Sequence, residues 1–344
     1  MNFMSDNVAG VAPAILEAMI AANEGTAPSY GADPITRQME QRFSDLFGRT
    51  VTVFPVATGT AANALSLAQL SPPWGAIYCQ GEAHIQADEC GAPEMFTGGA
   101  KLVPLPGAHG KLDAGTLTEA LARAHKGFVH AVQPAVLSLT QATEAGTVYQ
   151  PAEIAALADI AHAHGLSVHM DGARFANAVA HLGCDPADVT WRAGVDVLSF
   201  GATKNGAMAA EAVIFFDPAK AADFAFRRKR AAHLFSKMRF LSAQLDAYLT
   251  DGLWLRLARH ANSMAARLAT GLAALPGVTL AHPVEANELF VTLPEAMIQG
   301  LEAAGFGFYR WEDRTIRLVT AWNTDAHCVT QLLEVAGNLA AGEK

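Results

Sequence analysis

Short apolar and β-branched runs alternate with stretches of helical periodicity through the middle of the chain. The runs predict strands at 51–55, 76–79, 101–105, 128–132, 167–170, 195–199 and 212–216. The stretches between them predict helices at 60–70, 114–124, 151–164 and 218–234. This alternation is typical of parallel sheets covered by helices. We therefore predict an α/β fold with a central, mostly parallel seven-stranded sheet and flanking helices.

The two ends of the chain have different patterns. Residues 1–48 form an N-terminal helical segment, with helices expected at 12–22 and 34–47. A long amphipathic helix is expected at 253–275, because apolar residues occupy one side of it. Short strands at 278–281, 288–293, 307–309 and 315–319 and helices at 294–304 and 325–339 follow. We predict a large domain at 1–250 and a small C-terminal α+β domain at 251–344.

Composition narrows the class of protein. Hydrophobic residues make up 51% and charged residues 17% of the 344 residues, which suits a large buried core. The net charge of −9 argues against a nucleic-acid partner. No charged-then-apolar leader and no apolar run of ~18 residues occurs, so we expect no membrane insertion. The four cysteines form no CxxC pair, which favours a cytoplasmic location, and we expect no metal.

Lys204 is the first candidate for chemistry. It lies in the segment 199–206 (SFGATKNG), just after a predicted buried strand. A lysine amine at a strand end among small and apolar neighbours is suited to form an imine with a carbonyl group. A surface lysine in a loop is the alternative that the segment alone leaves open.

Asp171 and Arg174 lie at the end of another predicted strand, in the segment 169–174 (HMDGAR). A carboxylate at this position can bind a protonated ring nitrogen of a cofactor. An arginine nearby can hold a substrate carboxylate through two parallel hydrogen bonds. An aspartate helix cap paired with an arginine one turn later would give the same pattern.

Two further elements carry weaker signals. The segment 57–63 (ATGTAAN) joins a strand to a helix, and its small residues allow a phosphate to approach backbone amides at the helix N-terminus. His84 follows the next predicted strand and can stack on a ring or move protons. A plain turn and a loop histidine are the common alternatives.

The four elements have an informative order along the chain. A phosphate turn, a stacking histidine, a strand-end aspartate and then a lysine form the set that pyridoxal 5′-phosphate (PLP) requires. In this order the chain resembles the low-specificity L-threonine aldolases, which are fold type I PLP enzymes. The resemblance runs from Phe3 to Thr320, and HMDGAR, similar to the family's H-x-D-G-A-R, is its most specific part.

The resemblance implies a function and a set of roles. It implies PLP as cofactor and cleavage of L-threonine, L-allo-threonine and related β-hydroxy-α-amino acids into glycine and an aldehyde. Lys204 would hold the cofactor as an imine, with Asp171 on its ring nitrogen. The other implied contacts are Gly59, Thr60 and Ala61 to the phosphate, His84 on the ring, Arg174 at the cofactor, and Ser5, Arg174 and Arg317 to the substrate carboxylate.

The resemblance also implies a homodimer or homotetramer with shared active sites. The run Arg227–Arg230 stands out in an acidic protein, and a solvated helix face and an anion site are its two interpretations. In the family, a cationic helix and a Met-Arg step reach the phosphate of the neighbouring subunit. Arg239 matches that step, and Tyr30 resembles the tyrosine of a loop near the shared, substrate-binding site.

The segment 140–148 departs from the family pattern. Many members carry a second histidine in E-N-T-H, and here the stretch reads TQATEAGTV. The role of that histidine at the β-hydroxyl would then fall to His84, Thr143, Gln141 or water. We therefore expect weak discrimination between the two configurations at Cβ. A second departure is the segment 205–208 (NGAM), where relatives often read G-L-G-A-P.

Other functions compete with this interpretation. A fold type I β-eliminating lyase acting on aromatic or sulfur amino acids would use the same cofactor set, and its products would be ammonia and a keto acid. An aminotransferase would need a site that accepts two different side chains, and the sequence shows no sign of one. A catalytically idle PLP-binding protein is disfavoured because Lys204, Asp171 and Arg317 are all present. An NAD-dependent enzyme is disfavoured because no GxGxxG follows a predicted strand.

Overall fold

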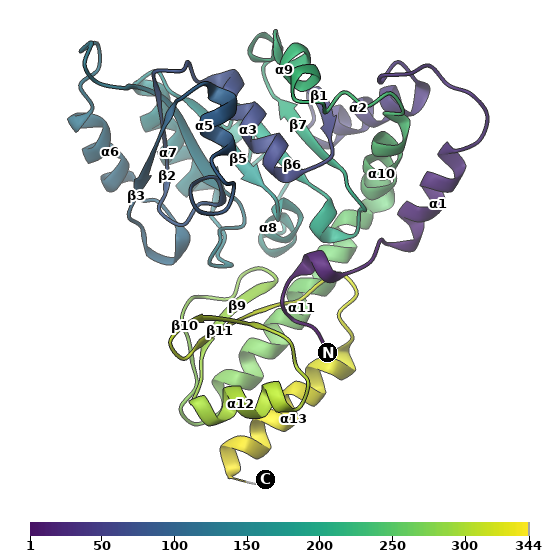
Figure 1. Cartoon of the computed structure of the whole chain (residues 1–344), viewed down its shortest axis with the longest axis vertical. Coiled ribbons are helices and arrows are strands. Elements are labelled where there is room, and N and C mark those ends of the chain that lie inside the picture. The colour runs from purple at the N-terminus through teal and green to yellow at the C-terminus, as the bar shows by residue number, and fades with distance from the viewer. Residues whose placement is uncertain (343–344) are drawn as a thin grey trace.

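A computed structural model describes residues 1–342 and contains two separate sheets (Figure 1). The larger sheet has seven strands in the order β1-β7-β6-β5-β4-β2-β3. Their bounds are β1 Thr52–Val56, β2 Gly75–Gln80, β3 Lys101–Leu105, β4 Gln133–Thr140, β5 Ser167–Gly172, β6 Val197–Gly201 and β7 Glu211–Phe215. β6, β5, β4, β2 and β3 run parallel, whereas β7 is antiparallel to both of its neighbours. The predicted fold class is confirmed.

Helices surround the large sheet. Those of the first 250 residues are α1 Pro13–Ala22, α2 Pro34–Leu46, α3 Gly59–Leu70, α4 His84–Ala87, α5 Ala92–Thr97, α6 Ala114–Arg123, α7 Pro151–Ala163, α8 Phe175–Leu182, α9 Phe224–Arg230 and α10 Arg239–Leu249. Helix α3 packs against β5, β6 and β7, and residues 61–68 of it are all buried. Strands β6 and β7 are buried along their whole length, as expected for strands covered on both faces.

The smaller sheet is antiparallel, in the order β10-β11-β9-β8, and lies below the larger one in Figure 1. Its elements are β8 Thr279–Leu280, β9 Glu288–Thr292, α12 Glu295–Ala303, β10 Tyr309–Glu312, β11 Thr315–Val319 and α13 Ala326–Ala341. The predicted strand 307–309 therefore begins later and extends further. Asn2 pairs with Gly307, so the N-terminal segment adds to this layer.

Helix α11, Leu253–Ala273, connects the two layers (Figure 1). Trp254 and Ala258 in its first half belong to the core of the large sheet. Leu268 and Leu272 in its second half belong to a separate core under the small sheet. One continuous helix therefore contributes to two hydrophobic cores.

Two sequence predictions in the large sheet were wrong. Residues 128–132 form an exposed loop, and the strand follows at β4, whose second residue is Pro134. Proline donates no ladder hydrogen bond, and the β2–β4 register shifts beside it, between Ala76 and Ile77. The helix predicted at 218–234 is interrupted near Ala222 and ends before Ala232, which has a φ of 63°. Helices α4, α5, α8 and α10 were not predicted.

Among residues 1–342, no helix combines the length and the apolar character that crossing a membrane requires.

Candidate active site

A cavity of about 320 Å³ opens at the carboxyl ends of β4, β5 and β6. Open α/β sheets place their ligands at this edge. The walls of the cavity include six residues that the sequence singled out: Gly59, Thr60, His84, Asp171, Arg174 and Lys204. Because they come from four segments far apart in sequence, the fold itself brings the candidate site together.

The position of Lys204 depends on a close approach of two strand ends. A side chain at Gly201, the last residue of β6, would place its Cβ 2.5 Å from the carbonyl oxygen of Ala173. Only glycine therefore fits where the end of β6 passes the residues that follow β5. Beyond it, buried Asn205 donates from Nδ2 to the Tyr248 hydroxyl at 2.6 Å, which anchors the turn. Lys204 forms no ion pair with any carboxylate among residues 1–342.

Asp171 is buried at the end of β5 and retains acceptor capacity. Its Oδ1 accepts from the Ala173 amide at 2.9 Å, and its Oδ2 accepts from Asn63 Nδ2 at 2.7 Å. A carboxylate has about four acceptor positions. Asp171 can therefore accept one further hydrogen bond from a ligand in the cavity.

His84 and Asp171 are linked through two residues that the sequence analysis missed. Glu89 Oε1 lies 2.9 Å from His84 Nδ1 and accepts from Asn63 Nδ2 at 2.8 Å. The hydrogen bond to Glu89 is the main cause that raises the pKa of His84. Asn63 therefore holds the two carboxylates of Glu89 and Asp171 at once. A buried polar residue in the mostly apolar helix α3 was the one signal that pointed to Asn63.

The N-terminus of α3 faces the cavity at Gly59 and Thr60. The first N–H groups of a helix have no intrahelical acceptor, and the helix dipole favours an anion there. A Cβ at Gly59 would meet open space, so the backbone is accessible at this point. The Ala61 amide instead bonds to the Thr58 hydroxyl at 3.2 Å, and Ala61 does not line the cavity.

Arg174 is already paired within the protein. Its Nε lies 2.8 Å from Asp6 Oδ2, and its Nη1 lies 3.3 Å from Glu288 Oε2. Burial opposes the charge, but Asp6 and Glu288 together raise the pKa of Arg174 above its ordinary value. Both carboxylates are buried, and neither was found from the sequence.

Arg317 shares Glu288 with Arg174 but lies outside the cavity wall. Arg317 Nε is 2.7 Å from Glu288 Oε1, and the guanidinium lies 5.6 Å from the ring centres of both Tyr309 and Trp311. Ser5 also lies outside the wall, and its hydroxyl accepts from the Asn7 amide at 3.1 Å. Asn7 takes a place in the wall instead.

Tyr30 and Arg239 lie away from the cavity and close to each other in the fold. The Tyr30 amide donates to the Ser236 carbonyl at 3.0 Å, and Arg239 donates to the Gly25 carbonyl at 3.4 Å. Lys229 Nζ lies 5.1 Å from the centre of the half-exposed Tyr30 ring. This surface therefore gathers the loop tyrosine and two cations at one place.

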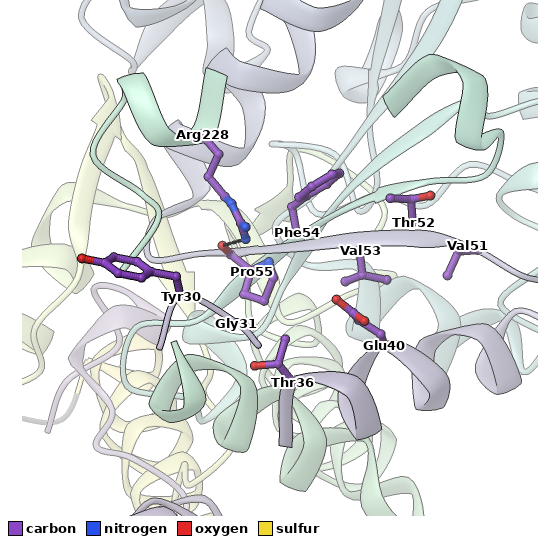
Figure 2. A pocket seen from close by; sticks show the side chains of 10 residues that line it. All are labelled: Tyr30, Gly31, Thr36, Glu40, Val51, Thr52, Val53, Phe54, Pro55 and Arg228. Atoms are coloured by element: carbon purple, nitrogen blue, oxygen red, sulfur yellow. Dashed lines mark hydrogen bonds between the residues drawn. The ribbon is translucent and has the colours of Figure 1, made fainter. Parts of the chain in front are cut away.

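A second cavity, of about 230 Å³, lies beside Tyr30 (Figure 2). Its wall includes Arg228 and Glu40, and Arg228 Nη1 donates to the Pro55 carbonyl at 3.3 Å. Arg228 is buried, and burial lowers its pKa to about 10. Part of the basic run is therefore internal rather than a solvated helix face.

The segment after β4 presents Glu144 to the main cavity. Gln141 and Thr143 point into the protein, since Gln141 Nε2 donates to the Tyr149 carbonyl at 2.9 Å and Thr143 Oγ1 lies 2.8 Å from Thr147 Oγ1. Glu144 lines the cavity, and burial raises its pKa to about 7. The sequence analysis passed over this residue.

Comparisons with known proteins agree with one another. Residues 2–296 match the model of the family described as β-eliminating lyase. The chain is 44% identical over 332 residues to a low-specificity L-threonine aldolase of Pseudomonas aeruginosa, which covers 96% of this chain and 95% of that protein. A relative of the same name from Pseudomonas sp. is 43% identical over the same shares.

A solved structure extends the agreement to three dimensions. The Leishmania major threonine aldolase superposes with a TM-score of 0.92 at 31% identity. The match covers 98% of this chain and 99% of that one.

Proposed function

Because this chain belongs to the β-eliminating lyase family and to the low-specificity L-threonine aldolases, we propose that it cleaves L-threonine, L-allo-threonine and related β-hydroxy-α-amino acids into glycine and an aldehyde. It is a carbon–carbon lyase that depends on PLP. The observation that carries the proposal is the meeting of Lys204 and Asp171 in one cavity beside the N-terminus of α3. These are the groups that an imine, a ring nitrogen and a phosphate require.

The residues present fit the cofactor. Lys204 forms no ion pair with a carboxylate among the described residues, Asp171 has acceptor capacity left, and the Gly59 backbone faces open space. Lys204 would hold the aldehyde carbon, Asp171 the ring nitrogen, and the amides of Gly59 and Thr60 the phosphate. When bound, PLP supplies an electron sink for the pair released at the substrate Cα.

The chain's own residues orient the substrate and move protons. Arg317 has its guanidinium held from one side by Glu288 and offers its remaining N–H groups to the substrate carboxylate. Arg174 is fixed by Asp6 and Glu288 and lines the cavity wall. His84 is held in place by Glu89 and covers one face of the cavity.

Borohydride reduction tests the assignment of Lys204. The purified protein should be yellow, and reduction should fix the cofactor to Lys204, as peptide mapping would show. Lys204→Ala should abolish the adduct, whereas Lys101→Ala, which changes an exposed lysine of β3, should leave it in place. An adduct on another lysine would contradict the proposal.

The description of the matched family favours β-elimination as a second candidate reaction. The same cofactor residues would then remove the proton at Cα first. Incubation with a panel of β-hydroxy, aromatic and sulfur amino acids separates the two reactions. Glycine with an aldehyde supports the aldolase, and ammonia with a keto acid supports the lyase.

Three further features complete the proposal. The active site is shared between copies of the chain in a dimer or tetramer, and the separation of Tyr30 and Arg239 from this chain's own cavity supports this. The protein is cytoplasmic, in keeping with four cysteines that are all free. The chain divides near residue 250 into domains 1–250 and 251–344. The two hydrophobic cores support that division, with Phe3 in the small core and Trp254 and Ala258 in the large core as the exceptions.

A further inference from the structure

Glu144 has one oxygen bonded to the protein and one without a partner. Its Oε1 accepts from the His84 amide at 2.8 Å and from the Thr140 hydroxyl at 2.9 Å. Its Oε2 is buried and has no hydrogen-bond partner among residues 1–342. A buried polar atom without a partner costs stability, so such atoms are rare unless they serve a function. The carboxyl is therefore held rigidly with one free oxygen in the cavity wall.

The other carboxyl groups of the cavity hold neighbouring protein groups. The ring of His84 pairs with Glu89, and Asn63 joins Glu89 to Asp171. Glu211 accepts from the Ala202 amide at 2.8 Å, next to the turn that carries Lys204. Glu89 also has a buried oxygen without a partner, Oε2, but its other oxygen holds both His84 and Asn63, whereas Glu144 comes from the segment that carries a histidine in many family members.

We propose that Glu144 is the catalytic residue that accepts the β-hydroxyl proton of the substrate. The inference rests on the proposed aldolase function. In the cleavage step, the O–H proton passes to Glu144 Oε2 and the C–O bond becomes C=O. The Cα–Cβ bond breaks and leaves its electron pair at Cα. Cα then takes up one proton to give glycine, and Glu144 releases the proton it gained, so atoms and charge balance.

The protonation of Glu144 suits this role. Burial raises its pKa to about 7, with a further rise from Asp171, while the hydrogen bonds from His84 and Thr140 lower it. An acid–base group works best when its pKa lies near the working pH. The titratable or charged groups that interact with Glu144 are His84, Asp171, Arg174, Cys79 and Tyr149.

The central test compares Glu144→Gln with wild type in two reactions. Cleavage of L-threonine should fall in kcat by roughly 10²- to 10³-fold, within the range that a general base contributes. Exchange of the glycine α-proton with deuterium oxide requires no hydroxyl proton, so we expect it to stay within about threefold of wild type. Glu82→Gln, which changes an exposed carboxyl two residues before His84, is the matched control and should cleave normally.

The pH profile gives an independent readout. Wild-type kcat should rise with pH through about 7 as Glu144 ionises, and the Gln variant should lack this limb. Thr140→Val removes a hydrogen bond to Oε1 that favours the ionised form, so it should move the limb to higher pH. A purely structural role for Glu144 would leave the limb where it is.

The outcomes separate this proposal from the aldolase function itself. If cleavage by the Gln variant stays within about threefold, or if cleavage and glycine exchange fall together, Glu144 does not serve the hydroxyl. If wild type catalyses neither reaction, the aldolase function has failed. In that case, infrared titration of the cofactor-free chain still measures the protonation of Glu144. A carboxyl band that titrates near pH 7 and weakens in Glu144→Gln supports the acid–base assignment, and an unchanged band overturns it.

Should Glu144→Gln not fold, Glu144→Asp keeps the carboxyl and shortens the side chain by one methylene. We expect it to retain the acidic limb with a lower kcat, and loss of the limb in the folded Asp variant would overturn the proposal.

Discussion

The histidine that opens the HMDGAR segment should make the stability of the protein depend on pH. His169 is fully buried in β5, with Nδ1 2.9 Å from the Ser138 hydroxyl of β4 and Nε2 2.9 Å from the Ser199 hydroxyl of β6. Burial lowers its pKa to about 4, against 6.5 when it is exposed. The folded protein therefore holds this histidine neutral where the unfolded chain protonates it.

The sign and size of the effect follow from these two values. Below pH 6.5 the unfolded state binds the proton more readily, so stability falls as pH drops from 6.5 towards 4. At about pH 5 the loss amounts to about 2 kcal/mol, and at about pH 7.5 it is close to zero. Glu144 and Glu211 have raised pKa values of about 7 and act in the opposite sense, so a variant is needed to isolate His169.

Urea unfolding of wild type and His169→Gln at both pH values provides the assay. The variant loses packing and is less stable at each pH, but its stability should change by about 2 kcal/mol less than that of wild type between them. Protein concentration and cofactor loading are held constant, because both shift apparent stability. His130→Gln, at an exposed position, is the control and should follow wild type. If wild type and His169→Gln change by amounts within about 0.5 kcal/mol of each other, the reasoning is refuted.

Three other predictions concern the active site. Arg317→Ala should lower kcat/KM by roughly 10²-fold, since it removes a charge-assisted contact worth about 3 kcal/mol. Arg314→Ala, on the same hairpin, is the control and should not lower kcat/KM. A change below about threefold in Arg317→Ala would exclude Arg317 from substrate binding. Hybrids of an Arg239→Ala chain with a Lys204→Ala chain should recover activity in one of two sites, and verified hybrids without activity would argue against sharing. The values of kcat/KM for L-threonine and L-allo-threonine should differ by no more than about 10- to 200-fold. A ratio above about 10³ would show that a residue of the site recognises the configuration at Cβ.

The parts of the site that local sequence predicts differ from those that only the fold reveals. Asp171 and Lys204 could be found because each lies at or just beyond the end of a buried strand, and parallel strands end at the same edge. The roles of Asn63 and Glu89 could not, because the contact between Asn63 and Asp171 spans 108 residues and that between Asn63 and Glu89 spans 26. The same holds for Asp6, which meets Arg174 across 168 residues. No local pattern carries such pairings.

The errors in the predicted fold have local causes. Strand β4 was displaced because residues 128–132 are apolar although exposed, while Pro134 made the true strand resemble a loop. Glu144 was not predicted, because the role of the family's second histidine was expected to fall to His84, Thr143, Gln141 or water. The direction in which each side chain points after β4 depends on the turn, which the sequence alone did not specify.

Helix α11 has a consequence for how the molecule unfolds. Because Trp254 anchors one end in the large core and Leu272 anchors the other in the small core, neither core can come apart without fraying a helix that the other needs. Proteins open in cooperative units, and a helix shared by both cores joins them into one unit. We therefore expect heat to melt both layers in a single transition, so that a calorimeter records one peak for a chain with two cores.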